Sequence, residues 1–138
     1  MLLFHPGRSF RMRCLHLLMI TGIGLSVFSA RPAAADPGSA ARGSDVFDEE
    51  CADCHSLRQG KNKKGPSLFA VVGRTAGSVA DYHYSDALKA GGFVWTPEKI
   101  DAYITHPKTM VPGGKMKYKG LDDARERADV VAFLQTIK

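Results

Sequence analysis

Small and apolar residues recur with helical spacing in the first third of this 138-residue chain. Between residues 39 and 50 they lie three or four positions apart, on one face of a helix, at Ala40, Gly43, Val46 and Phe47. Asp36 or Ser39 can cap the start of this helix. A glycine on the inner face indicates that another helix approaches closely at Gly43.

Two shorter helices are predicted further along the chain. Ser85 can cap a helix that runs through Lys89 and stops at the two glycines that follow. The sequence Thr96-Pro97-Glu98 combines an N-cap, a first-turn proline and an early acid, and so predicts the start of another helix. This second helix should end near Thr105, because the next residue precedes a proline.

The last predicted helix covers residues 122–136. We expect two acids, Asp122 and Asp123, to lie at its positive end. The positions expected to face inward are Ala124, Ala128, Val131 and Leu134 or Phe133. No run is typical of a β-strand and no internal repeat is visible, so the predicted fold class is all-α.

Two segments between the helices are predicted to be loops, residues 57–81 and 107–120. The first contains four glycines, a proline and a basic run. Such a long irregular segment is unusual in a compact domain unless it has a function. A large bound cofactor would supply the core that these loops lack.

The first 35 residues are typical of a secretory signal peptide. Three arginines precede a mostly apolar run, residues 15–28, and Ala33 to Ala35 offer a cleavage site. The apolar run is shorter than the about 20 residues of a membrane-spanning helix, although an uncleaved anchor and a buried helix remain alternatives. We predict cleavage after Ala35, one domain at residues 36–138 and a periplasmic location.

Cleavage would remove most of the net positive charge of the chain. The formal net charge is +5, but four of the 19 Lys and Arg residues precede the cleavage site. The remaining 15 basic residues face 14 Asp and Glu residues, which leaves +1. Overall charge therefore gives no support to nucleic-acid binding.

The sequence Cys51-Ala52-Asp53-Cys54-His55 carries the clearest chemistry in the chain. Two thiols three positions apart, followed by an imidazole, are the attachment signature of haem c. Each thiol forms a thioether with one vinyl group, and His55 is then held beneath the iron as an axial ligand.

Two other sites use a Cys-x-x-Cys pair. A thioredoxin-type redox pair belongs in a βαβ context, which this sequence lacks. A structural zinc site needs two more Cys or His ligands at suitable spacing. Outside the motif the chain has only Cys14, within the predicted signal peptide, and scattered histidines.

Residues 36–138 resemble class I cytochrome c of the bacterial periplasmic and mitochondrial type. The resemblance rests on short motifs in the family's order: Cys51-x-x-Cys54-His55, Gly65-Pro66-Ser67-Leu68, Gly73-Arg74, Tyr84-Ser85-Asp86-Ala87, Trp95, Tyr103, Pro107-Lys108 and Pro112-Gly113-Gly114-Lys115-Met116. It implies that the N- and C-terminal helices pack together while loops wrap around one covalent haem c.

The resemblance also implies the second axial ligand. This would be Met116, and Met/His ligation raises the reduction potential of haem. Met110 is the competing methionine, and His83 and His106 are weaker alternatives. The carbonyl of Pro66 would accept a hydrogen bond from the ring nitrogen of His55 that does not face the iron.

Four further residues occupy positions where the family contacts the haem. Arg74, Tyr84 and Trp95 would donate hydrogen bonds to its propionates, and Tyr103 would lie beside the Met ligand. Trp95 and Tyr103 also fit ordinary core positions, since a lone Trp is often buried and Tyr103 shares a helical face with Ile100.

Three positions depart from the family's usual residues. Gly114 stands where relatives often have Thr, Leu88 replaces a polar residue near the haem, and Glu50 replaces a lysine. We expect the first two changes to loosen the Met loop and alter the potential. Glu50 makes the partner-facing surface less uniformly basic.

The implied function is that of a soluble one-electron carrier between respiratory or photosynthetic redox complexes, not an enzyme. It would be a monomer and would meet redox partners at the haem edge, near Lys108, Lys115, Lys117 and Lys119. Two alternatives remain: a ligand-binding or peroxidase-like protein with a labile Met ligand, or an electron-entry subunit of a larger oxidoreductase.

Overall fold

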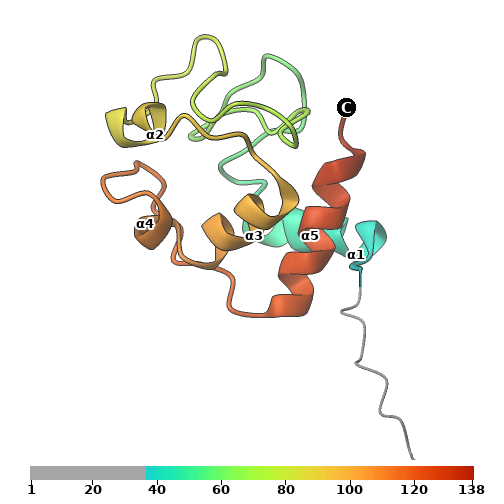
Figure 1. The fold of residues 1–138 in the computed structure, drawn as a ribbon. Helices are drawn as coiled ribbons and strands as arrows, with labels where there is room; N and C mark the ends of the chain where they lie inside the picture. The colour runs from blue at the N-terminus through green and yellow to red at the C-terminus, as the bar shows by residue number, and fades with distance from the viewer. Residues whose placement is uncertain (1–36) are drawn as a thin grey trace, which may run out of the picture. The chain divides into compact units, whose positions relative to one another are not determined.

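The computed structural model describes residues 37–138, which contain five helices and no β-strand. The predicted signal peptide, residues 1–35, lies outside the described residues. The helices are α1 (Ala40–Glu50), α2 (Asp86–Ala90), α3 (Pro97–Thr105), α4 (Pro107–Met110) and α5 (Ala124–Thr136). Figure 1 shows them together with the irregular segments that connect them. The predicted all-α fold class is confirmed.

Three of these helices begin where local capping residues predict. The side chain of Ser39 accepts a hydrogen bond from the backbone N–H of Arg42 at the start of α1. Ser85 caps α2 in the same way, and Thr96 caps α3 with Pro97 in the first turn. Each cap satisfies an N–H group that would otherwise lack a partner within its helix.

Helix α4 corrects the prediction of a continuous loop from residue 107 to residue 120. Pro107 starts a single helical turn, in which the N–H of Val111 donates to the Pro107 carbonyl at 3.0 Å. Proline is compatible with the first helical position because its missing N–H is not needed there. The turn places Met110 against the hydrophobic core.

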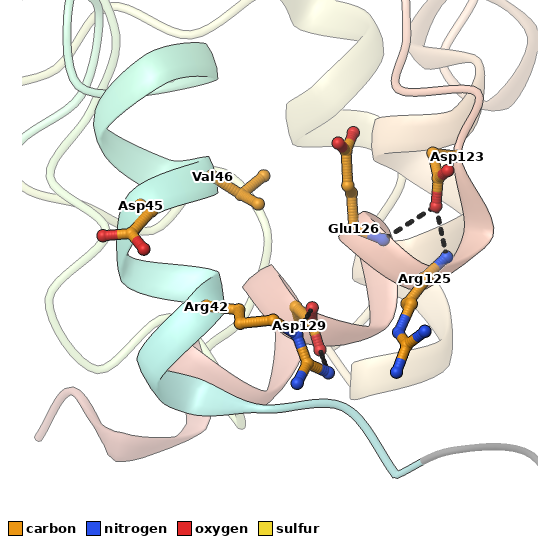
Figure 2. Close-up of a pocket in the computed structure, with 7 residues that line it drawn as sticks. All are labelled: Arg42, Asp45, Val46, Asp123, Arg125, Glu126 and Asp129. Atoms are coloured by element: carbon orange, nitrogen blue, oxygen red, sulfur yellow. Dashed lines mark hydrogen bonds and ion pairs between the residues drawn. The ribbon is translucent and has the colours of Figure 1, made fainter.

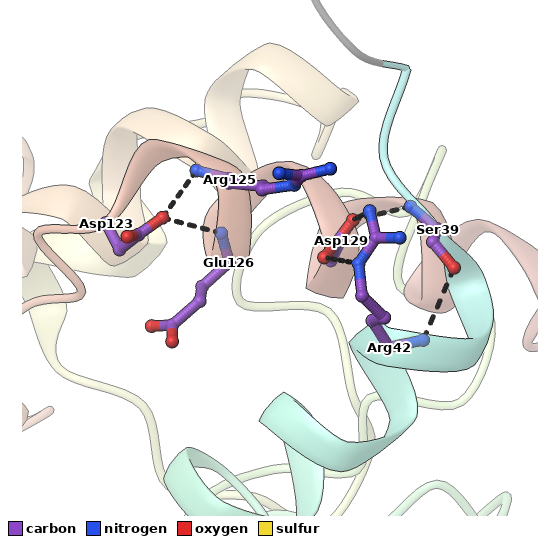
Figure 3. Close-up of polar contacts among 6 residues, drawn as sticks. All are labelled: Ser39, Arg42, Asp123, Arg125, Glu126 and Asp129. Atoms are coloured by element: carbon purple, nitrogen blue, oxygen red, sulfur yellow. Dashed lines mark hydrogen bonds and ion pairs between the residues drawn. The ribbon is translucent and has the colours of Figure 1, made fainter.

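Helix α5 follows the predicted position, but its inward face was predicted only in part. The side chain of Asp123 caps the helix by accepting from the N–H groups of Arg125 and Glu126, as Figure 3 shows. Ala124 is exposed, which contradicts the prediction, and the buried residues are Asp129, Val130, Val131 and Leu134. The buried face is therefore rotated toward Val130, because that side faces α1 and α3.

Helices α1 and α5 pack against each other, and α3 packs against α5 (Figure 1). A Cβ atom at Gly43 would overlap the backbone carbonyl of Asp129, so the backbones of α1 and α5 are in direct contact there. This confirms the close approach predicted at Gly43. One turn further along, the rings of Phe47 and Phe133 lie 5.8 Å apart.

An ion pair also joins the two helices. Arg42 on α1 contacts both carboxylate oxygens of Asp129 on α5, at 2.6 and 2.8 Å, and the N–H of Ser39 donates to the same carboxylate (Figure 3). Asp129 is only 3% exposed, whereas Arg42 reaches solvent. The three donors satisfy a charge whose burial would otherwise be costly.

The segment from residue 57 to residue 81 contains no helix, as predicted. One isolated β-bridge joins Thr75 to Val94, and it brings the first long loop against the start of α3. Among the described residues, no helix is long and apolar enough to cross a membrane.

Candidate functional site

The two thiols of the Cys-x-x-Cys-His motif lie directly after α1. The N–H groups of Cys51 and Ala52 both donate to the carbonyl of Phe47, so the motif continues from the helix without a flexible linker. Both thiols are free; Cys51 is partly buried and Cys54 is exposed. Burial, followed by the nearby Glu50 and Cys54, raises the pKa of Cys51 to about 11.

This thiol chemistry differs from that of a redox pair. A dithiol catalyst needs a nucleophilic cysteine whose pKa is lowered, whereas the pKa of Cys51 is raised. A structural zinc site is also unsupported, since no group of three or more His, Cys, Asp or Glu side chains could hold a metal ion within residues 37–138. The remaining chemistry of the motif is covalent attachment.

The ring of His55 is held by the loop that contains Gly65 and Pro66. His55 Nδ1 lies 2.8 Å from the carbonyl oxygen of Pro66. A carbonyl can only accept, so Nδ1 carries the proton and the Nε2 lone pair remains available. Gly65 packs directly on the ring, because a Cβ there would come within 2.7 Å of Nδ1.

The surroundings of His55 favour its neutral form. Burial is the main cause that lowers its pKa; the hydrogen bond to Pro66 opposes this shift and the nearby Lys63 adds to it. A metal-ligating imidazole must be neutral, so the local electrostatics suit a ligand. The Pro66 carbonyl thus sets the tautomer of His55, whereas burial of the ring favours its neutral form.

The predicted haem contacts from the middle of the chain lie in one cluster. Backbone hydrogen bonds pair the segment of Arg74 with that of Trp95, at 2.8 and 2.9 Å. The ring of Trp95 lies 5.0 Å from that of Tyr103. Tyr84 is buried, and Arg74 is close enough to lower its pKa, although burial is the larger effect and raises it.

Met116 is partly buried and lies in the segment after α4. The ammonium of the preceding Lys115 donates to the carbonyl of Tyr84 at 3.3 Å and to that of His83 at 2.9 Å. Met110, in contrast, packs against the hydrophobic core of the helices. No described contact joins Met116 to His55, so the structure leaves the ligand role of Met116 as a prediction.

The sequence profile of the family described as cytochrome c matches residues 40–138, which is well over half of the chain. The chain belongs to the cytochrome c family. Cytochrome c2 of Rhodopila globiformis is 46% identical over 104 residues, which cover 75% of this chain and 98% of that protein. Cytochrome c of Euglena viridis is 40% identical over 101 residues, 73% of this chain and 99% of that protein.

A third relative is similar to this chain over only part of that relative's own length. The protein named cytochrome c-type cyt cy from Rhodobacter capsulatus is 43% identical over 100 residues, which cover 72% of this chain and 50% of that protein. Membership of the cytochrome c family makes this chain a haem-based electron carrier with a covalent haem c, for which Cys51 and Cys54 are suited.

The charge around Arg74 fits the cofactor of a cytochrome c. Its guanidinium donates to the carbonyls of Phe69 and Ser67 at 2.6 and 2.8 Å, and burial lowers its pKa. Among the described residues, no carboxylate forms an ion pair with it. A partly buried cation in this position is complementary to an anionic group such as a haem propionate.

Two surface hollows are lined by neither of the predicted axial residues, His55 and Met116. An open hollow of about 590 Å³ between α1 and α5 is lined by charged side chains that include Arg42, Asp45 and Glu126 (Figure 2). It contains none of the predicted site residues. A second hollow of about 400 Å³ lies among the loops and includes Arg74.

Sequence reasoning missed side chains that hold the loops of the site. Asn62 Oδ1 accepts the N–H of Ser67 at 2.9 Å, next to Pro66. Tyr118 donates to Glu50 Oε2 at 2.7 Å, across 68 positions of sequence. Burial, followed by this hydrogen bond, raises the pKa of Tyr118, so its hydroxyl stays a donor. The Tyr118–Glu50 pair joins distant segments, so no local pattern could have revealed it.

Proposed function

We propose that this cytochrome c carries single electrons between larger redox complexes, with His55 and Met116 as its axial ligands. Cys51 and Cys54 would provide the two thioether links. When bound, the haem c of this family supplies an iron that exchanges one electron between its ferric and ferrous forms. The observation that carries the proposal is the neutral His55, whose Nδ1 lies against the Pro66 carbonyl.

The protein's own residues would set the conditions for this exchange. Pro66 holds the imidazole in one tautomer, and the packing of Gly65 against the ring restricts its rotation. A thioether from Met116 is a soft, neutral ligand that favours a high potential. If His55 and Met116 both bound the iron, no coordination position would remain for a substrate, which would favour a carrier over a catalyst.

Four further side chains would contact the propionates of the haem or the Met ligand. Arg74, Tyr84 and Trp95 are proposed as donors to the two carboxylates, and Tyr103 as a neighbour of Met116. Their support is the cluster that they form and the partly buried charge of Arg74.

A pair of matched variants tests the axial ligand. In protein matured by a haem-competent host, Met116→Ala should abolish the near-infrared absorption of the ferric Met-ligated state and lower the potential by on the order of 0.1 V. Met110→Ala should retain both, because Met110 packs against the helical core. If Met110→Ala alone loses the absorption, the assignment of the ligand is wrong.

Four lysines around Met116, which we call the Met-loop lysines, are proposed as the surface that meets a redox partner. They are Lys108, Lys115, Lys117 and Lys119, and all four are exposed. Such a surface would attract an acidic face of the partner and would raise the encounter rate more than the affinity. Export to the periplasm after cleavage at Ala35, and a monomeric state, complete the proposal.

A further inference from the structure

The segment that carries Met116 has little backbone support of its own. Upstream, the N–H of Gly114 donates to the Val111 carbonyl at 2.9 Å, and downstream the N–H of Leu121 donates to the Ile104 carbonyl at 2.9 Å. Between these anchors, no backbone-to-backbone hydrogen bond of the described chain involves residues 115–119. The position of Met116 therefore depends on side-chain contacts of its neighbours.

Two such contacts hold the segment from different sides. The ammonium of Lys115 binds the carbonyls of His83 and Tyr84. Two residues after Met116, the hydroxyl of Tyr118 donates to the carboxylate of Glu50 at 2.7 Å, while its ring packs against the hydrophobic core.

Glu50, the partner of Tyr118, lies next to the attachment motif. Glu50 is the last residue of α1 and immediately precedes Cys51, the first thiol of the attachment motif. The backbone there is rigid, because Cys51 and Ala52 both donate to the carbonyl of Phe47. The hydrogen bond thus ties a segment without regular structure to the fixed end of a helix.

We infer that Tyr118 is a positioning residue for Met116, because its hydrogen bond to Glu50 fixes the Met116 segment to the end of α1 where the haem is attached. This inference rests on the proposed ligation by Met116. Opening of the segment would release the ligand, and the hydrogen bond is lost on opening. Removing it therefore raises the fraction of protein in the open state.

An added ligand reports on that fraction. Free imidazole can replace Met116 only when the segment opens, so its apparent affinity rises with the open population. In the ferric matured protein, we expect Tyr118→Phe to bind imidazole about fivefold more tightly than wild type, which corresponds to about 1 kcal/mol, the usual net contribution of one hydrogen bond. The aromatic ring and its packing are retained in this variant.

The control variant is Tyr82→Phe, which removes a hydroxyl that binds outside residues 115–119 and keeps the ring that packs on Tyr84. The hydroxyl of Tyr82 donates to the carbonyl of Lys64 at 2.9 Å and is exposed, as that of Tyr118 is. Tyr82→Phe should leave the imidazole affinity unchanged. Unfolding midpoints of both variants separate a local effect from a general loss of stability.

A second variant, at the hydrogen-bond acceptor Glu50, keeps the inference testable if Tyr118→Phe fails to incorporate haem. Glu50→Ala should increase imidazole affinity as Tyr118→Phe does, and alanine suits the last turn of a helix. The double variant should match the single variants, since both changes remove one hydrogen bond. Additive effects would contradict the pairing.

Two results overturn the inference, and they can be told apart. If wild-type ferric protein shows the near-infrared absorption of Met ligation and Tyr118→Phe binds imidazole as wild type does, the positioning role is wrong while the proposed ligation stands. If wild-type protein lacks that absorption and Met116→Ala changes nothing, the ligation and the positioning role both fail.

Discussion

At the scale of single residues, Gly65 matters because its lack of a side chain leaves room for the imidazole of His55. Any Cβ at this position would lie within 2.7 Å of Nδ1 and 2.8 Å of Nε2. The neighbouring carbonyl of Pro66 accepts from the same ring. The orientation of His55 therefore depends on a contact between backbone and ring that only glycine permits.

We predict that Gly65→Ala destabilises the matured protein by about 1–3 kcal/mol, the usual cost of an inserted methyl group in a packed site. The ring must move, so the ferric absorption spectrum should also change. Denaturant unfolding followed by absorption measures both effects.

Gly60→Ala is the matched control. Its φ is +68°, so alanine there is strained, but no atom lies within 4 Å of the added Cβ. We expect a loss of about 1 kcal/mol from backbone strain alone, with an unchanged spectrum. Equal spectra for both variants would show that Gly65 does not control the ring.

At the scale of elements, the contact between α1 and α5 joins the two ends of the domain. Gly43 allows the backbones to touch, and Phe47 packs against Phe133 one turn later. The contact also sets the direction in which α1 delivers the attachment motif. The proposed haem-binding residues thus depend on a helix pair that contains neither His55 nor Met116.

We predict that Gly43→Ala lowers the free energy of unfolding by about 1–3 kcal/mol, since the Cβ would overlap the carbonyl of Asp129. The sign of this change in free energy is informative, because replacing Gly with Ala at an exposed helix position stabilises the helix by up to about 1 kcal/mol. Asp48→Ala, at an exposed position of the same helix, serves as the control and should not destabilise. Denaturant titration distinguishes the two signs.

The ion pair between the same helices predicts a pH dependence. The hydrogen bond from Arg42, followed by that from Ser39, lowers the pKa of Asp129 below its ordinary value. Its contribution to stability is therefore present above the ordinary pKa and is lost as the pH falls through the lowered pKa of the folded state. Asp129→Asn removes this contribution.

We expect Asp129→Asn to be less stable than wild type at neutral pH and the difference to shrink in acid. Unfolding free energies measured over a pH series test this expectation. Arg42→Gln should weaken the same pH dependence, because it removes the largest cause of the pKa shift. A stability difference that stays constant with pH would contradict the argument.

At the scale of the whole described domain, charge is distributed unevenly. Exposed acids, including Asp48, Glu49 and Glu50, follow one another at the end of α1, whereas the Met-loop lysines flank Met116. Two of these lysines have structural contacts: Lys108 donates to the carbonyl of Gly114, and Lys115 to that of Tyr84. Lys117 and Lys119 are therefore better suited to test docking.

We predict that the double variant Lys117→Ala/Lys119→Ala reacts about two to five times more slowly with ferricyanide, an anionic one-electron oxidant, at low ionic strength. The difference should disappear as salt screens the charges. Stopped-flow rates across an ionic-strength series measure it. Lys61→Ala/Lys138→Ala removes the same charge from two other exposed positions and should have a smaller effect; equal effects would mean that the Met-loop lysines are not special.

Features that depend on neighbouring residues could be predicted from the sequence alone. Ser39, Ser85 and Thr96 start helices because each side chain binds an N–H three residues later. The attachment motif is local for the same reason, since haem attachment requires two thiols and an imidazole at short, defined spacing. Sequence was therefore sufficient to determine the starts of α1, α2 and α3, the cofactor and the family.

Features that depend on distant residues were decided only by the tertiary structure. The buried face of α5 includes Asp129 and excludes Ala124, because Arg42 and Ser39 bring three donors to that carboxylate from the other end of the chain. Tyr118 likewise finds Glu50 across 68 positions. Such partners are determined by how the helices and loops pack in space, and the spacing of residues along the sequence does not indicate them.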